Sequence, residues 1–291
     1  MKSGFACLLC GGTAAKPFLE GCTDRYLGRP GTVDYLRCAG CGLVQQHPLP
    51  ADVAALYAGY PVHRPKSRLY SRVRRALMAG VYLPPQRWPA GSRLLDYGCG
   101  DGGYLEWCIE AGVACVGYEP DAAHAQALAW RLGVPVYADT AALAADKVAG
   151  FDVITLHFVV EHLADPRAVL ASLARLLKPG GTIRYVVPAI DSWEFRLFGR
   201  RWHGLDPPRH LSFPDAGHAR RLAAELGLRF GGEQPVPFPN GFGGSLPTAL
   251  LGSFNIGLFI ATLPLSVALT RLFPGGNKAC SLHRPAVKSP G

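Results

Sequence analysis

Short apolar runs with β character alternate with segments of helical periodicity between residues 93 and 188. Strand-like runs such as RLLDYG and FDVITLHF are followed by amphipathic stretches such as DAAHAQALAWRLG and DPRAVLASLARLL, and this order repeats. Strands that alternate with amphipathic helices form a parallel sheet covered on both faces, and ligands bind at the carboxyl ends of its strands. The pattern therefore predicts an α/β fold with a Rossmann-like doubly wound, mainly parallel sheet.

A glycine-rich loop follows the first of these strands in the stretch LLDYGCGDGGYL, residues 94–105. The glycines at 98, 100 and 103 match the G-x-G-x-x-G pattern of a dinucleotide site, and Glu119 follows roughly 20 residues later, as such a site requires. An NAD-dependent oxidoreductase is therefore one interpretation. Asp96 and Gly102 favour another, because they extend the run to D-x-G-x-G-x-G. A carboxylate in that position repels a pyrophosphate and suits a cationic ligand group.

From this loop onward the chain resembles the class I S-adenosylmethionine-dependent methyltransferases. The segments FDVITLHFVVEHLADP and LARLLKPGGTIRYVVP are similar to that family's fourth strand and to its fifth helix and strand, and PPRHL is similar to a segment of ubiquinone-pathway O-methyltransferases. The resemblance implies that the loop wraps the methionine part of the cofactor, that the first acid holds its amino group, and that the second binds the ribose hydroxyls. A further acid matches a position that often contacts adenine. The implied cofactor residues are Asp96, Gly98, Gly100, Gly102, Glu119 and Asp139.

Three histidines are candidates for a catalytic base. An oxygen or protonated nitrogen nucleophile must lose a proton during methyl transfer, and an imidazole titrates near the operating pH. His157 and His162 lie at and just after the end of the fourth strand, where the methyl group is expected, and His210 belongs to PPRHL. For each, the alternative is a structural histidine bonded to a backbone carbonyl. Glu161 either orients the imidazole of His162 or caps the next helix.

Two CxxC pairs, CLLC and CAGC, each followed by glycine, lie in the first 50 residues. Together they supply four thiolates, which complete the tetrahedral shell of a structural zinc ion, and glycine permits the tight turn at each pair. Four buried or redox-active thiols are the alternative. We predict a zinc-ribbon module over residues 1–50, with Cys22 as a spare thiol and with the ligands Cys7, Cys10, Cys38 and Cys41.

A basic helical linker is predicted over residues 51–90, ending at the Pro- and Gly-rich YLPPQRWPAGS. Six basic residues surround apolar positions at helical spacing, so the helix either lies solvated across the next domain or binds phosphate groups at an interface. These residues are Arg64, Lys66, Arg68, Arg72, Arg74 and Arg75. The net charge of +9 favours an anionic partner without selecting one. DNA is not expected, because HFVVEH stands where an NPPY-like motif would be needed.

The hydrophobic content of 49%, against 18% charged residues, requires either a large core or membrane contact. Part of the excess lies in residues 246–273, which carry no charge before Arg271. The stretch is long enough to span a bilayer, but the following ACSLHRPAV is expected to return to the sheet as its closing strand, which excludes a single crossing. We predict two short helices, broken near Pro264, that contact the membrane or cover the substrate entrance, with burial as ordinary core as the alternative.

An aromatic and basic stretch after the fifth strand is either a substrate lid or a packed insertion. It contains Trp193, Phe195, Arg196, Phe198, Arg200, Arg201 and Trp202.

These features predict a methyltransferase domain over residues 91–291 that carries the apolar insertion 246–273. The expected reaction is S-adenosylmethionine-dependent methyl transfer to a small-molecule or lipid-linked acceptor, at oxygen. An N-terminus without a secretory signal and cysteines in metal-ligand spacing predict a cytoplasmic protein, associated with the inner face of the membrane if the insertion binds it. The alternatives are a catalytically inactive cofactor-binding scaffold, an RNA methyltransferase and an NAD-dependent oxidoreductase.

Overall fold

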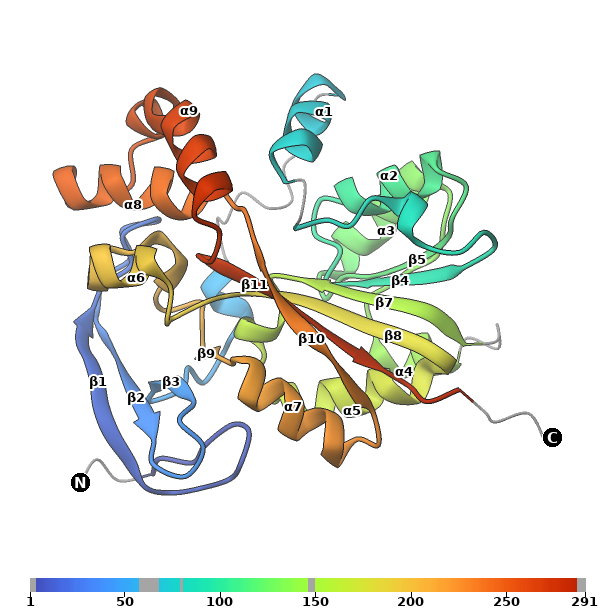
Figure 1. Cartoon of the computed structure of the whole chain (residues 1–291), viewed down its shortest axis with the longest axis horizontal. Helices are drawn as coiled ribbons and strands as arrows, with labels where there is room; N and C mark the ends of the chain where they lie inside the picture. The colour runs from blue at the N-terminus through green and yellow to red at the C-terminus, as the bar shows by residue number, and fades with distance from the viewer. Residues whose placement is uncertain (1–3, 58–67, 79–80, 146–149, 287–291) are drawn as a thin grey trace.

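The structure, a computed structural model, describes residues 4–57, 68–78, 81–145 and 150–286 (Figure 1). A seven-stranded sheet forms its centre and a four-stranded sheet lies to one side. In spatial order the larger sheet contains β10 (Arg229–Val236), β11 (Asn277–His283), β8 (Leu177–Pro188), β7 (Phe151–His157), β4 (Arg93–Tyr97), β5 (Ala114–Tyr118) and β6 (Val136–Tyr137). The smaller sheet contains β1 (Ala15–Cys22), β2 (Val33–Cys38), β3 (Val44–His47) and β9 (Ser212–Phe213).

Strands β6, β5, β4, β7 and β8 run parallel to one another, and β11 lies antiparallel between β8 and β10. Central strands of this kind are covered on both faces, so they are apolar on both sides instead of alternating with polar residues. Leu94 and Leu95 in β4 and Ile154 in β7 are accordingly all buried. The predicted doubly wound, mainly parallel sheet is confirmed, and so is the predicted closing strand, which is β11.

Helices cover both faces of the larger sheet (Figure 1). On one face lie α2 (Gly103–Glu110) and α3 (Ala122–Leu132), and on the other α4 (Thr140–Ala145), α5 (Pro166–Leu176) and α7 (Ala216–Glu225). Three of these helices begin at an aspartate whose side chain accepts a backbone N–H from the first turn, which stabilises a helix start. These caps are Asp121, Asp165 and Asp215.

The fourth strand of the smaller sheet, β9, comes from a segment far from the other three in the sequence. β9 pairs antiparallel with β3, so that Val44 faces Phe213 and Gln45 faces Ser212. In addition, Leu36 and Leu43 of the N-terminal module belong to the same apolar cluster as Leu156 and Leu170 of the larger domain. The N-terminal module is therefore packed on the sheet domain and shares its core.

The linker segment is helical only in part. Among the described residues it contains a 3-10 turn η1 (Ala54–Tyr57), the helix α1 (Arg68–Leu77) and a second turn η3 (Pro85–Arg87), while Arg64 and Lys66 lie outside the described residues. Arg74 pairs with Asp101, and Arg75 pairs with Glu106 and Glu110 of α2. Of the predicted basic side chains, Arg74 therefore attaches α1 to the glycine loop and Arg75 attaches it to α2, whereas Arg72 is exposed.

The apolar insertion forms two helices, α8 (Asn240–Leu251) and α9 (Ile256–Leu272). The predicted break near Pro264 is wrong, because Pro264 lies inside α9. Instead α8 ends at Gly252, which has a left-handed φ of 81°, and α9 begins at Asn255, whose side chain accepts the N–H of Leu258. These stop and start signals lie between Pro247 in α8 and Pro264 in α9, and they set the break between the two helices. Within the described part of the chain, no helix has the length and apolar character needed to cross a membrane.

Candidate functional site

The glycine loop lies between β4 and α2 at the carboxyl edge of the sheet. Gly98, Gly100 and Gly102 have φ values of 78°, 54° and 74°, a region in which glycine alone carries no steric cost. A Cβ atom added to Gly98 would lie 2.6 Å from a methyl carbon of Val159. The predicted glycines therefore make a turn with three left-handed residues in five positions, and its backbone is bare enough to approach a ligand closely.

Two buried carboxylates flank this loop. Asp96, in β4, accepts a hydrogen bond from Thr155 Oγ1 at 2.7 Å, and Glu119, directly after β5, accepts the N–H of Gly100 at 3.1 Å. Buried carboxylates favour ligands that offer cationic or hydroxyl donors. S-adenosylmethionine carries both, as an ammonium group and ribose hydroxyls, so the residues present fit the cofactor that the resemblance implies.

Asp139 lies after β6, outside this buried pair. Its two carboxylate oxygens accept the N–H groups of Ala141 and Ala142 at 3.3 and 2.9 Å, so the side chain is bonded to the first turn of α4. It is exposed. Its contact with adenine stays a prediction.

His157 ends β7 and lies beside Asp96. Its Nδ1 lies 3.3 Å from Oδ1 of Asp96, and its ring stands edge-on to the rings of Tyr82 and Tyr104, each at 4.7 Å between centroids. Burial lowers the pKa of His157 and outweighs the opposite effect of Asp96. The structure therefore brings this histidine to within 3.3 Å of Asp96.

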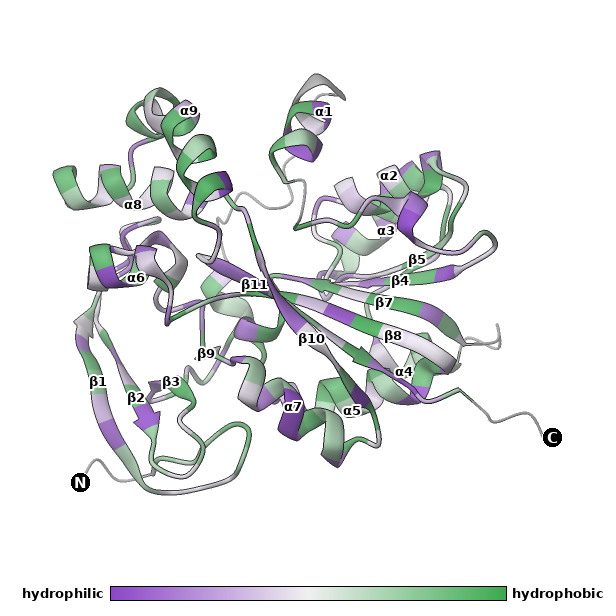
Figure 2. Ribbon diagram, in the orientation of Figure 1, coloured by the Kyte–Doolittle hydropathy of each residue, from purple (hydrophilic) through white to green (hydrophobic). Residues whose placement is uncertain are grey.

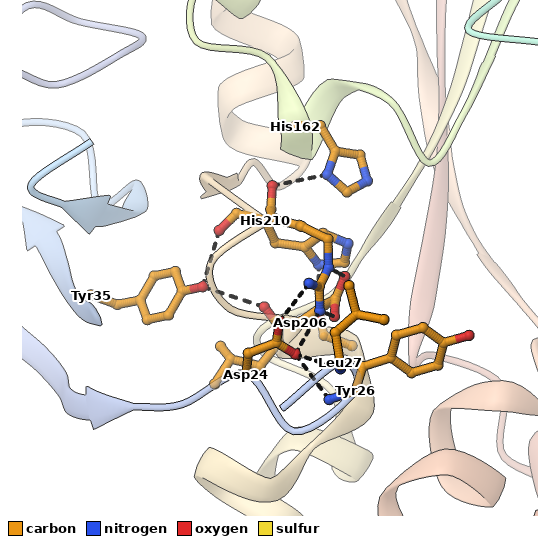
Figure 3. A network of polar contacts seen from close by, with 10 residues as sticks. Asp24, Tyr26, Leu27, Tyr35, His162, Asp206 and His210 are labelled. Carbon is orange, nitrogen blue, oxygen red and sulfur yellow. Dashed lines mark hydrogen bonds and ion pairs between the residues drawn. The ribbon is translucent and has the colours of Figure 1, made fainter. Parts of the chain in front are cut away.

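His162 and His210 form a second group (Figure 3). Their ring centroids are 4.6 Å apart, although His162 ends the turn η4 (Val160–His162) and His210 belongs to the later PPRHL loop. Nδ1 of His162 donates to the carbonyl of Arg209 at 2.9 Å, and Nδ1 of His210 donates to the carbonyl of Gly204 at 2.8 Å. Because a carbonyl only accepts, each neutral ring carries its proton on Nδ1 and its lone pair on Nε2.

Burial keeps both rings neutral. It lowers the pKa of His162 below the usual imidazole range, and burial together with the neighbouring His162 lowers the pKa of His210 to about 3. At neutral pH the cluster therefore offers two unprotonated Nε2 atoms, and either can accept a proton or bind a metal ion.

Glu161 lies beside these histidines and is 0% exposed. Among the described residues, neither of its carboxylate oxygens has a hydrogen-bond partner, and burial raises its pKa well above the usual range. Both predicted roles are wrong: the carbonyl of Arg209 fixes the ring of His162, and Asp165 caps the next helix. One ligand atom each of Glu161, His162 and His210 lie within 4.8 Å of one another, so this cluster could hold a metal ion.

A buried arginine joins the PPRHL loop to the N-terminal module (Figure 3). Arg209 is 0% exposed and bonds Asp24, between β1 and β2, at 2.7 and 3.0 Å, and Asp206 at 2.9 and 2.6 Å. Tyr35 of β2 donates its hydroxyl to the carbonyl of His210 at 3.0 Å. The module therefore holds the loop from which His162 and His210 take their orientation. The PPRHL motif by itself did not predict this role of Arg209, Asp24 and Tyr35.

The four predicted zinc ligands come together. Their sulfur atoms all lie within 4.8 Å of one another, with 3.5 Å between Cys7 and Cys41 and 3.6 Å between Cys10 and Cys38. Zinc–sulfur bonds of about 2.3 Å place the sulfurs of a regular tetrahedron about 3.8 Å apart, so the donor set fits a zinc ion. Burial raises the pKa of Cys38, but hydrogen bonds from the N–H groups of Cys41 and Gly40 more than offset this and bring it to about 7. Cys22 is buried outside this group.

In the aromatic and basic stretch the aromatic side chains are buried or half-buried, whereas Arg196, Arg200 and Arg201 are exposed. It forms α6 (Trp193–Phe198) and the turns η5 (Gly199–Arg201) and η6 (His203–Leu205). Phe195 stacks on Phe18 of the N-terminal module at 5.7 Å, and Trp202 is buried and donates to Glu194. These contacts favour the packed insertion over the substrate lid.

The sheet order, the glycine loop and the two buried acids define a methyltransferase fold, and comparison with known families agrees. Residues 67–230 match the family model described as "Methyltransferase domain", which covers more than half of the chain. The chain belongs to this family.

Curated relatives are named ubiquinone biosynthesis O-methyltransferase. One from Xanthomonas axonopodis pv. citri is 34% identical over 108 residues, covering 35% of this chain and 45% of the relative. One from Chelativorans sp. is 38% identical over 96 residues, covering 31% of this chain and 38% of the relative. The chain thus spans less than half the length of these relatives.

A solved structure from Thermotoga maritima, described as an S-adenosylmethionine-dependent methyltransferase and possible histamine N-methyltransferase, is similar in fold. It is 15% identical with a TM-score of 0.50, and the match covers 80% of this chain and 100% of the other. At that identity the similarity shows the fold alone.

Proposed function

We propose that this protein transfers a methyl group from S-adenosylmethionine to an oxygen atom of a small-molecule or lipid-linked acceptor. The observation that carries the proposal is the loop with three left-handed glycines between the buried carboxylates of Asp96 and Glu119. Membership of the methyltransferase family supports it. Bound S-adenosylmethionine supplies an electrophilic methyl group, and the residues of the chain do the rest.

Asp96 and Glu119 hold the two polar ends of the cofactor. Asp96 accepts a hydrogen bond from Thr155, and Nδ1 of His157 lies 3.3 Å from its Oδ1, which supports a carboxylate held in place to receive an ammonium group. Glu119 is tied to the loop through the N–H of Gly100, which places a hydroxyl-binding carboxylate at the end of the next strand. Preorganised acceptors of this kind lose little entropy when the ligand binds.

His162 is the proposed general base. Its Nδ1 is committed to the Arg209 carbonyl, which leaves Nε2 to take the proton from an acceptor hydroxyl. Because burial lowers the pKa of His162, its lone pair stays available at pH values where a free imidazole would be protonated. His210, with its own Nε2 exposed to the same cluster, is the second candidate, and His157 is assigned to orient Asp96.

The chemistry of the cluster and the names of the relatives support transfer at oxygen. A hydroxyl acceptor must lose its proton as the new bond forms, and this cluster offers unprotonated imidazoles for that step. The curated relatives are O-methyltransferases by name. Exclusion of water and alignment of the acceptor supply much of the rate in such displacements.

The four N-terminal cysteines are proposed to hold a structural zinc ion. The sulfur distances suit a closed tetrahedral shell, which leaves no open position for chemistry. The role of this module would then be to hold Asp24 and Tyr35 against the PPRHL loop.

The test is transfer of a labelled methyl group. Full-length protein is incubated with methyl-labelled S-adenosylmethionine and hydroxylated aromatic and lipid-soluble acceptors, and products are identified by mass spectrometry. Label should appear on an acceptor oxygen, and His162→Gln should lose turnover but keep cofactor affinity, whereas His47→Gln, which changes a histidine of the N-terminal module, should keep both. Label found only in RNA, or cofactor binding without transfer to any acceptor, would contradict the proposal.

A further inference from the structure

The hairpin formed by α8 and α9 is built with its polar side chains inside and its apolar side chains outside. In α9 the exposed positions recur in steps of three to four residues, which places them along one side of the helix. The apolar ones are Ile256, Gly257, Ile260, Ala261, Pro264, Leu265, Ala268 and Leu272, and Arg271 lies among them. Ser266 and Thr270 of the same helix are buried. This is the reverse of the arrangement expected for a helix on a water-facing surface.

The first helix of the hairpin repeats the inversion. Ser245 and Thr248 are buried, whereas Leu250 and Leu251 at its end are exposed. Together with Leu272 and Phe273 at the end of α9, these side chains form an apolar outer face. In Figure 2 much of the ribbon of α8 and α9 is green, at the edge of the molecule. We call this outer face the hairpin face; its most exposed large members are Leu250, Leu251, Ile256, Ile260, Leu272 and Phe273.

The hydroxyl groups of the hairpin are satisfied internally. Ser245, Thr248 and Thr270 each donate to the carbonyl four residues earlier in their own helix. Thr262 does the same toward Leu258. An environment without water requires that polar groups find partners within the segment, and these bonds meet that requirement.

Small residues and specific bonds fix the hairpin in place. Ser266 accepts the N–H of Gly243 across the two helices at 3.1 Å. Trp193 donates to the carbonyl of Phe273 at 2.7 Å, and the N–H of Phe254 bonds to the carbonyl of Arg25 at 2.9 Å. Close helix contact through small residues is typical of helices that meet in lipid. The hairpin is therefore fixed to the rest of the protein, and the hairpin face is exposed in that fixed position.

The exposed charged side chains described on the hairpin and along the hollow beside it are basic, and the acid that lines that hollow, Asp206, is paired with Arg209. The sequence contains no aspartate or glutamate after Glu233. Arg271 is exposed in the last turn of α9, and the exposed Arg200 and Arg201 line the same hollow as Phe254, which lies between the two helices. The arginine-rich helix α1 lies at the same edge of the molecule (Figure 1).

From these observations we infer that the hairpin face docks on the surface of an anionic lipid membrane. Arginines around an apolar face complement phosphate headgroups, whereas a two-fold contact with a second copy would bring like charges together. At 1.5 Å per residue, α9 is about 26 Å long, shorter than the roughly 30 Å apolar thickness of a bilayer, so the hairpin lies in the interface and does not span it. This inference does not depend on methyl transfer.

The experiment is flotation of full-length protein with vesicles of phosphatidylcholine alone and of phosphatidylcholine with phosphatidylglycerol. Wild type should float with the anionic vesicles, and less so at high salt. Ile260→Glu should reduce binding by about tenfold or more, because it places a charge on the hairpin face. Trp130→Glu is the matched control: Trp130 is 89% exposed on α3, Ile260 is 61% exposed, and both changes add the same charge at a solvent-facing apolar site.

Absence of wild-type flotation with anionic vesicles would overturn the inference, as would equal flotation with neutral vesicles or an equal loss in the two variants. Sedimentation of the same samples tests whether a second copy of the chain covers the hairpin face instead. A dimer that Ile260→Glu dissociates, without vesicle binding by wild type, would assign the hairpin face to a second copy instead. Circular dichroism of each variant checks that its helices are kept, so that a loss of binding is not attributed to unfolding.

Discussion

Replacing Arg209 by methionine tests the link between the N-terminal module and the histidine loop. The change keeps an unbranched apolar stem at this position but removes the guanidinium group that bonds Asp24 at 2.7 and 3.0 Å. It also removes the partner of Asp206. Two carboxylates would then stay in the interior without their cation, which is the costly way to break a buried ion pair.

The expected cost is about 3–5 kcal/mol in the free energy of unfolding, the range for removing one partner of a buried pair. An unfolding entropy of roughly 2.1 cal/mol/K per residue converts this into a fall of about 5–8 °C in Tm for a chain of 291 residues. Burial raises the pKa values of Asp24 and Asp206, but hydrogen bonds and the charge of Arg209 outweigh it, so both pKa values are lowered. The stabilisation is therefore present above the unfolded pKa of about 3.9 and lost as the pH falls through the folded pKa values.

Urea unfolding at pH 7 and near pH 3 measures both effects. At pH 7 Arg209→Met should be destabilised by the amount given, and the deficit should shrink at the lower pH, where the unpaired carboxylates become protonated. Arg201→Met is the control, since Arg201 is exposed, and it should change stability by about 0.5 kcal/mol or less. Equal stability of the two variants at pH 7 would refute the reasoning.

Three further predictions concern the other sites. Elemental analysis should find about one zinc per chain, and Cys38→Ser should lose it; unchanged zinc content would rule out the cysteine site. Because burial lowers the pKa of His162, the rate of methyl transfer should persist below pH 6.5 and fall only as the pH drops through the lowered pKa; an acid limb centred above about 6.5 would count against His162 as base. Gly98→Ala should weaken S-adenosylmethionine binding about tenfold or more, since its Cβ would meet Val159 at 2.6 Å in a left-handed backbone; calorimetry giving wild-type affinity would contradict the loop geometry.

Local sequence signals predicted the cofactor edge well. Asp96, the glycines and Glu119 lie within two consecutive strand–turn units, so their proximity follows from the parallel sheet alone. The CxxC pairs likewise carry their own geometry, because each pair is one tight turn. In such cases the residues that make the site are close in sequence or on adjacent strands.

Signals that depend on distant partners were missed. Arg209 and Asp24 are 185 residues apart, and nothing in either neighbourhood indicates the other. Glu161 was expected to bond locally, but tertiary packing encloses it without a partner. The break in the apolar insertion was placed at Pro264, whereas the glycine and asparagine caps at Gly252 and Asn255 set it. An exposed helix can tolerate an internal proline when packing holds it, so the caps were the stronger signal.

The central claim is that the loop between Asp96 and Glu119 binds S-adenosylmethionine, and titration calorimetry tests it directly. Wild type should bind S-adenosylmethionine saturably and show no saturable binding of NAD. Asp96→Asn and Glu119→Gln should each lose about 10- to 150-fold in affinity, the equivalent of roughly 1.5–3 kcal/mol for a hydrogen bond to a charged group, and Glu225→Gln on α7 should lose none. Saturable binding of NAD in place of S-adenosylmethionine, or wild-type affinity in both loop variants, would contradict the account.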